Sequence, residues 1–92
     1  MINPLFWKGK RVFVTGHTGF KGGWICLWLK HLKAEVIGYS LEPATVPSLF
    51  EVADVGEGMQ SIIGDIRDHA KLSKTILESK PDVVIHMAAQ PL

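Results

Sequence analysis

The feature that most constrains this sequence is a run of β-forming residues that stops at a glycine, with two more glycines at regular spacing behind it. Residues 12–15 form the run, Gly16 ends it, and Gly19 and Gly22 follow at intervals of three. The apolar, helix-like stretch 24–32 comes next. Strand, glycine-rich turn and helix in this order are typical of the opening of a nucleotide-binding α/β domain.

Each of the three glycines has its own physical role in this interpretation. Gly16 leaves the strand through a tight turn that favours a positive φ angle, which glycine adopts cheaply. Gly19 has no Cβ, so a pyrophosphate can approach the backbone, and Gly22 lets the helix pack close to the strand. The first N–H groups of the helix then face the ligand, with a dipole contribution of about 0.3–1 kcal/mol per nearby negative charge. The alternative is a turn whose glycines serve packing alone.

Composition restricts the class of protein. A chain of 92 residues with 47% hydrophobic and 21% charged residues is one small globular domain at most. The net charge is +1 and the basic residues are scattered, which argues against nucleic-acid binding. No apolar stretch approaches the ~20 residues of a membrane span. The N-terminus does not resemble a secretory signal, and the single cysteine, Cys26, has no internal partner, so we expect a cytoplasmic protein.

The remaining pattern predicts an α/β fold with a parallel, Rossmann-like sheet. Residues 1–10 form a lead-in whose apolar patch packs on the sheet edge. Strands are predicted at 11–15, 35–39, 61–64 and 82–86. One helix is predicted at 20–32, and another begins at an Asp68 cap and runs to about Lys80. A capping box formed by Ser48 and Glu51 predicts a short helix at 49–53. Right-handed crossovers give the strand order 3-2-1-4, with a crevice between residues 16–22 and 87–90. The chain supplies only the N-terminal half of such a fold.

The same pattern predicts which side chains are buried. Apolar residues surround so much of the first helix that most of it, including Trp24 and Trp28, is expected to be buried, with Cys26 as a core or half-buried residue. In the later helix, Leu72, Ile76 and Leu77 are expected to be buried. Gly38 is expected to allow a close approach to the second strand, and His86 to be a buried or half-buried strand residue.

Several polar residues are candidates for the rest of a dinucleotide site. Ser40 stands where an acid usually binds the adenosine ribose, and it is otherwise a plain loop residue. No arginine follows that strand, which favours NAD over NADP. Asp65 and Ile66 suit the adenine, although Asp65 could instead cap a turn. Lys21 lies either beside the pyrophosphate or in solvent.

Two further groups of residues have structural interpretations. Arg67 and Asp68 are expected to form a surface pair and a helix cap. The four histidines, His17, His31, His69 and His86, lack the spacing of a metal site.

With these residues in view, the sequence resembles the extended short-chain dehydrogenase/reductases, and most closely their CDP-glucose 4,6-dehydratase family. The resemblance covers nearly the whole chain. It rests on residues 6–22, including His17 and Lys21 of the glycine motif, on 46–51, on 64–68, and on 86–92, which contain Ala-Gln-Pro-Leu.

The resemblance implies NAD as a tightly held cofactor and CDP-glucose as the substrate. In that family, NAD takes a hydride from C4 of the sugar, water is lost across C5 and C6, and the hydride returns to C6, which gives CDP-4-keto-6-deoxyglucose for deoxysugar and cell-surface polysaccharide synthesis. Cofactor roles carry over to the following residues: Gly16, His17, Thr18, Gly19, Phe20, Lys21 and Gly22 for the pyrophosphate, Asp65 and Ile66 for the adenine, and Ala88 and Ala89 for the nicotinamide ribose. Ser40 replaces the acid that is common in related enzymes.

The catalytic machinery of that family is not in this sequence. Its Tyr-x-x-x-Lys pair is missing, because Tyr39 is the only tyrosine and Pro43 stands four residues later. We therefore expect residues 1–92 to be the N-terminal part of an NAD-binding Rossmann domain in a longer, homo-oligomeric enzyme, inactive and marginally stable by itself. A nucleotide-sugar epimerase or reductase, and a non-catalytic NAD-sensing module, remain alternatives.

Overall fold

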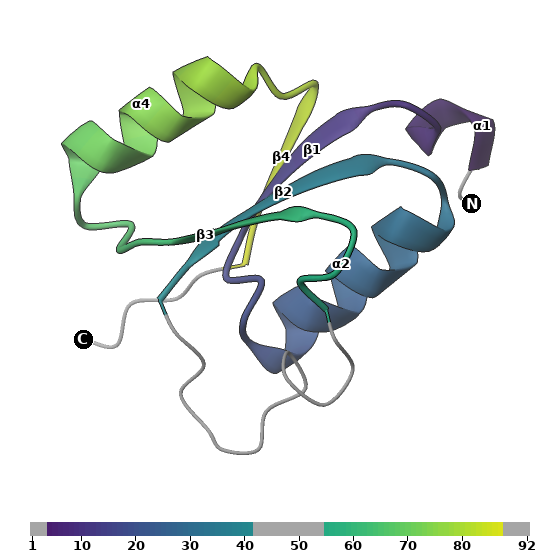
Figure 1. The fold of residues 1–92 in the computed structure, drawn as a ribbon, viewed down its shortest axis with the longest axis horizontal. Coiled ribbons are helices and arrows are strands. Elements are labelled where there is room, and N and C mark those ends of the chain that lie inside the picture. The colour runs from purple at the N-terminus through teal and green to yellow at the C-terminus, as the bar shows by residue number, and fades with distance from the viewer. Residues whose placement is uncertain (1–3, 42–54, 88–92) are drawn as a thin grey trace.

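A computed structural model describes residues 4–41 and 55–87 of the chain. They form one parallel sheet with helices on both faces (Figure 1). The elements in chain order are α1 (Pro4–Trp7), β1 (Arg11–Thr15), α2 (Phe20–His31), β2 (Glu35–Ser40), β3 (Gln60–Ile63), α4 (His69–Ser79) and β4 (Val83–His86). The strand order is β3-β2-β1-β4, which confirms the predicted 3-2-1-4. The predicted short helix at 49–53 lies outside the described residues.

The register of the sheet aligns the carboxyl ends of its central strands. Thr15 at the end of β1 is opposite Tyr39 of β2 on one side and His86 of β4 on the other. Ser40, the last residue of β2, is opposite Ile63 of β3. The turns that follow these strands therefore all begin at one edge of the sheet, where open α/β sheets bind their ligands.

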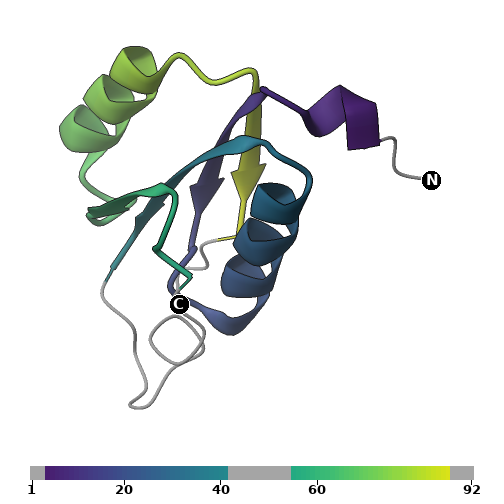
Figure 2. The ribbon, with the colours of Figure 1, turned by 45° about the vertical axis from the view of Figure 1, so that its right-hand side comes forward.

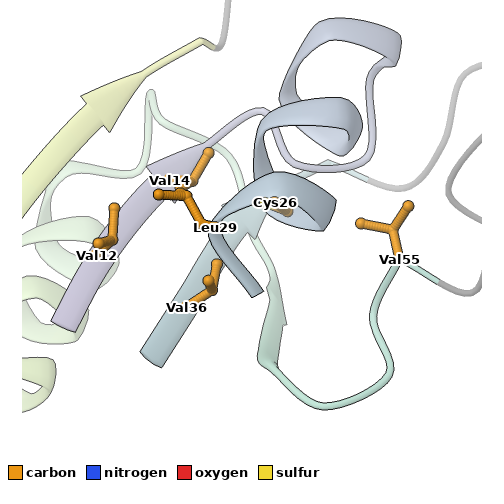
Figure 3. Packing of buried hydrophobic residues seen from close by; sticks show 6 residues of the cluster. All are labelled: Val12, Val14, Cys26, Leu29, Val36 and Val55. Carbon is orange, nitrogen blue, oxygen red and sulfur yellow. The ribbon is translucent and has the colours of Figure 1, made fainter. Parts of the chain in front are cut away.

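Helices α2 and α4 lie on opposite sides of the sheet (Figure 2). On the α2 side, Cys26 and Leu29 pack with valines of the central strands and with Val55, which precedes β3 (Figure 3). Cys26 is fully buried, as predicted, and burial raises the pKa of its thiol to about 12. On the α4 side, a second buried cluster contains Phe13, Ile37 and Tyr39, with Ile62, Ile66, Leu72 and Ile76 packed against it.

Helix α2 is less buried than its composition predicted. Trp24 is 53% exposed and Trp28 is 45% exposed. One helical turn separates these two residues, so they share a face, and that face points away from the one that carries Cys26 and Leu29. The expectation that most of this helix is buried was therefore wrong, because only one face of α2 meets the sheet. The helix ends at His31, and Lys33 takes a φ of 68° beyond it.

Helix α4 begins and ends as its sequence indicated. The Asp68 side chain accepts a hydrogen bond from the Lys71 N–H at 3.1 Å, which confirms the predicted cap. Lys80 takes the left-handed conformation and Pro81 follows. The predicted burial of Leu77 was wrong, since this side chain is 74% exposed. At about 100° per residue, Leu77 points away from the side of the helix that carries Leu72 and Ile76.

The ends of the described fold also differ from expectation. Residues 4–7 form a helical turn, α1, in which Leu5 is 79% exposed and Phe6 is 49% exposed, and only Trp7 packs against the core. At the other end, His86 is exposed, so its predicted burial was wrong. Strand β4 has β1 as its only neighbour among the described residues, and its side chains alternate: Val83 and Ile85 pack against the α2-side cluster, whereas Val84 and His86 point to the other face and are exposed.

Two leucine variants test this account of the two helices. Leu29→Ala should lower the free energy of unfolding by about 2–5 kcal/mol, because it leaves a cavity in the buried cluster. Leu77→Ala should change it by less than about 0.5 kcal/mol, because the side chain is already in solvent. Urea-induced unfolding of both variants measures the difference. Equal destabilisation would contradict the orientation of α4.

Candidate cofactor site

The turn between β1 and α2 is closed by hydrogen bonds between its glycines and the neighbouring strand. Gly16 takes a φ of 82°, and its N–H donates to the Tyr39 carbonyl of β2 at 2.9 Å. The Gly19 N–H donates to the Gly16 carbonyl at 3.1 Å, and the Gly23 N–H donates to the Gly19 carbonyl at 2.8 Å. The positive φ confirms the prediction for Gly16, since other residues adopt it only at a cost.

Gly22 brings the start of α2 against the backbone of this turn. A Cβ at Gly22 would overlap the Gly16 carbonyl oxygen and lie 2.7 Å from its carbonyl carbon. No flexible side chain is available there to move aside. The close packing predicted for Gly22 is therefore present, although its partner is the turn after β1 and not the strand.

Gly19, in contrast to Gly22, lies in open surroundings. A Cβ there would meet only the Gly16 carbonyl oxygen within 4 Å, at 3.5 Å, which is an ordinary contact. Gly19 is exposed, is the N-cap of α2 and provides no side chain for the N–H groups of the first turn. Those groups have no acceptor four residues earlier inside the helix. The site thus offers an open backbone surface and unused donors to an anionic ligand.

The side chain of His17 points into the protein. Its Nε2 lies 2.7 Å from the Ser61 Oγ of β3, and its ring occupies the space that a Cβ at Gly38 would need. The predicted close approach at Gly38 is therefore made by an imidazole. The ring is fully buried, and this desolvation lowers the pKa of His17 to about 4. A neutral imidazole thus joins the glycine-rich turn to β2 and β3.

Two more residues of the turn have different surroundings. Thr18 is nearly buried, and its hydroxyl lies 2.9 Å from the Ser40 hydroxyl and donates to the Leu41 carbonyl at 2.7 Å. Lys21 is exposed on the first turn of α2, where Phe20 begins the helix. Their contacts with a cofactor remain predictions.

The segment after β3 is attached to the same edge of the sheet. The Gly64 N–H donates to the Ser40 carbonyl at 2.8 Å, and the Tyr39 hydroxyl donates to the Asp65 carbonyl at 3.1 Å. The Asp65 carboxylate accepts hydrogen bonds from the guanidinium and from the backbone N–H of Arg67, and these lower its pKa. The expected pairing of Arg67 with Asp68 was wrong, since a turn brings Asp65 to the guanidinium. Ile66 packs against the core beneath.

The edge between β1 and β4 supplies the last part of the site. The Met87 N–H donates to the Thr15 carbonyl at 3.0 Å and lies 3.1 Å from the Thr15 hydroxyl. The same hydroxyl lies 2.7 Å from His86 Nδ1. Thr15 was not singled out from the sequence, because it resembles any other strand residue there. Ala88 and Ala89, predicted for the nicotinamide ribose, lie outside the described residues.

Lys30 is a second residue that the sequence did not reveal. Its ammonium group donates to the carbonyls of Val55 and Glu57, each at 2.6 Å. This contact holds the segment before β3 against α2. A helical lysine looks like a solvated residue in the sequence, and no spacing rule predicts such a partner.

Residues 4–41 and 55–87 contain no group of three or more histidine, cysteine, aspartate or glutamate residues placed to hold a metal ion. No helix in this part of the chain has the length and apolar character to span a bilayer.

Comparison with known proteins identifies relatives of this arrangement. The sequence model of the NAD dependent epimerase/dehydratase family matches residues 12–92. The chain is 61% identical over all 92 residues to CDP-glucose 4,6-dehydratase of Salmonella typhimurium, and it covers 26% of that protein.

Solved structures agree with this result. WbmH of Bordetella bronchiseptica in complex with NAD+ has a TM-score of 0.73 and 27% identity, over 89% of this chain and 26% of that one. UDP-glucose 4-epimerase of Brucella ovis in complex with NAD has a TM-score of 0.71 and 25% identity, over 91% and 24%. The chain thus spans about a quarter of the length of the relatives it matches.

Substitution by alanine should have different effects on stability at Gly22 and at Gly19. Gly22→Ala should lower the free energy of unfolding by about 1–3 kcal/mol or more, because the new methyl group meets backbone that cannot move aside. Gly19→Ala should change it by less than about 1 kcal/mol, since its surroundings are open. Chemical unfolding compares them. If Gly19→Ala proved the more damaging, the packing of the turn would be misassigned.

Burial of His17 should make stability depend on pH. The unfolded chain protonates this residue near pH 6.5 and the folded chain near pH 4, so the unfolded state binds more protons between these values. Stability should therefore fall as the pH is lowered from 6.5 to 4, by up to about 1.4 kcal/mol per pH unit.

Unfolding free energies at several pH values test this dependence. His17→Gln should flatten it, and His31→Gln, at an exposed histidine, should leave it unchanged. An unaltered slope in His17→Gln would show that another group is responsible.

Proposed function

Because the chain belongs to the NAD dependent epimerase/dehydratase family, we propose that residues 1–92 are the N-terminal, cofactor-binding part of an NAD-dependent CDP-glucose 4,6-dehydratase. The single observation that carries the choice within the family is the 61% identity over the whole chain to the Salmonella enzyme. The proposed substrate is CDP-glucose, and the proposed product is CDP-4-keto-6-deoxyglucose.

The geometry of the glycine-rich turn supports NAD as the cofactor. The backbone at Gly19 is open, and the first turn of α2 directs N–H groups towards the same space. We assign the pyrophosphate to the turn 16–22, the adenosine to Ser40, Asp65 and Ile66, and the nicotinamide ribose to Ala88 and Ala89. When bound, NAD would supply a hydride acceptor and donor, and these residues would hold and orient it.

The surroundings of Tyr39 support placing the catalytic groups elsewhere in the parent enzyme. Tyr39 is fully buried, stacks on Phe13 with ring centroids 6.1 Å apart, and donates its hydroxyl proton to the Asp65 carbonyl. Burial, together with the nearby Asp68 and Asp65 charges, raises the pKa of its phenol. A phenol held in this way is a core residue and a poor catalytic base.

We further propose that the parent enzyme is a cytoplasmic homo-oligomer that serves deoxysugar synthesis for cell-surface lipopolysaccharide. The buried thiol of Cys26 is compatible with a reducing compartment.

A chimera tests the proposed activity. The corresponding N-terminal segment of the Salmonella dehydratase would be replaced by residues 1–92, and CDP-glucose would be supplied with NAD. We expect the ultraviolet absorbance of the 4-keto product in alkali. Product NMR distinguishes dehydration from epimerisation, the main alternative. An inactive chimera beside an active native enzyme would contradict the proposal.

Within this chimera, Gly19→Val should abolish NAD binding measured by calorimetry, because its branched side chain would occupy the space assigned to the pyrophosphate. Leu77→Ala, at an exposed position on α4, is the matched control and should bind NAD normally. Undiminished affinity in Gly19→Val would rule out this location for the pyrophosphate.

A further inference from the structure

A chain of hydrogen bonds joins the glycine-rich turn to the end of β2. The Thr18 hydroxyl oxygen lies 2.9 Å from the Ser40 hydroxyl oxygen and 2.7 Å from the Leu41 carbonyl oxygen. Thr18 is 7% exposed and Ser40 is 9% exposed, so packing restricts both side chains. This corner lies at the carboxyl end of the strand that usually carries the ribose-binding acid in dinucleotide domains.

The donor and acceptor properties of these groups determine the direction of each hydrogen bond. A carbonyl oxygen only accepts, so the Thr18 hydroxyl must give its single proton to Leu41. The 2.9 Å contact then requires Ser40 to donate its own proton to Thr18. Ser40 Oγ is left with lone pairs and no free proton. It is therefore an acceptor, as a carboxylate is, but without the charge.

On the basis of the proposed function, we propose that the Thr18–Ser40 pair determines specificity for the cofactor's adenosine ribose. Ser40 accepts the hydrogen bond of a ribose 2′-hydroxyl, which favours NAD. Because the pair is uncharged, it excludes the 2′-phosphate of NADP only weakly. Thr18 does not itself meet the ribose in this scheme and acts as a positioning residue that orients the Ser40 proton.

A carboxylate in the place of Ser40 would exclude the 2′-phosphate of NADP more strongly, because two negative charges would repel each other. Two like charges 4 Å apart repel by about 1 kcal/mol in water and about 4 kcal/mol near a protein surface, which corresponds to roughly 5-fold to 1000-fold in affinity. To bind NADP, the Ser40 hydroxyl has only to rotate, so that it donates its hydrogen bond to the 2′-phosphate and no longer to Thr18. This exchange costs at most one neutral hydrogen bond, equivalent to roughly 2-fold to 10-fold.

The acid that follows β3 beside this corner is already paired. The Gly64 N–H donates to the Ser40 carbonyl, which ties that segment to the end of β2. Asp65 follows it, and the Arg67 guanidinium lies 2.6 Å from the Asp65 carboxylate. This ion pair offsets the negative charge that would otherwise oppose a 2′-phosphate.

Calorimetric titration of the chimera described above with NAD and with NADP tests the inference. The two dissociation constants should differ by about tenfold or less, in favour of NAD. Thr18→Val removes the acceptor for the Ser40 proton, so it should shift the ratio towards NADP by roughly 2-fold to 10-fold, and Thr18→Ser should restore it. Ser40→Asp should raise the preference for NAD by about tenfold or more. Circular dichroism checks that each variant folds.

Three outcomes would overturn the inference. A preference for NAD of about a hundredfold or more in the unaltered chimera is one, and an unchanged ratio in a folded Thr18→Val variant of it is another. The third is a strong preference for NAD that is lost in a Glu42→Gln variant, because the selectivity would then belong to Glu42. Failure of the unaltered chimera to bind either dinucleotide would be a different result, because it would contradict the proposed function itself.

Discussion

The contact between Gly22 and the Gly16 carbonyl determines where α2 begins relative to the sheet. The missing Cβ allows the first turn of the helix to lie directly on the turn that leaves β1. The face of α2 that carries Cys26 and Leu29 then packs on the valines of β1 and β2, and the N–H groups at its start are directed to the carboxyl edge of the sheet. Core packing and ligand binding thus depend on the same close approach.

Polar contacts around this turn hold the neighbouring segments in place. His17 reaches β3, Thr18 reaches the end of β2, and Lys30 holds the segment before β3. These contacts come from the glycine-rich turn and α2, and each ends on a residue far along the sequence. The corner at the end of β2 is consequently built by side chains as well as by the strand register.

Local sequence patterns predicted the parts of the fold that local physics determines. The β-branched residues of β1, the glycine spacing and the Asp68 cap each correspond to a single local structure, and topological rules then gave the strand order. Patterns failed where tertiary context decides. Apolar composition could not show which face of α2 meets the sheet, and no local pattern indicated that Lys30 bonds the carbonyls of Val55 and Glu57.

Amide chemical shifts provide the most direct test of the central claim. NAD would be titrated into the 15N-labelled chain, and the amide signals of residues 16–22 would be compared with those at the opposite edge, where the Arg11 N–H donates to the Asp82 carboxylate at 2.8 Å. The account predicts that the largest shifts occur at Gly19 and in the first turn of α2, with little change at Arg11. Shifts centred on Arg11 and Asp82, or none at the glycine-rich turn, would contradict it.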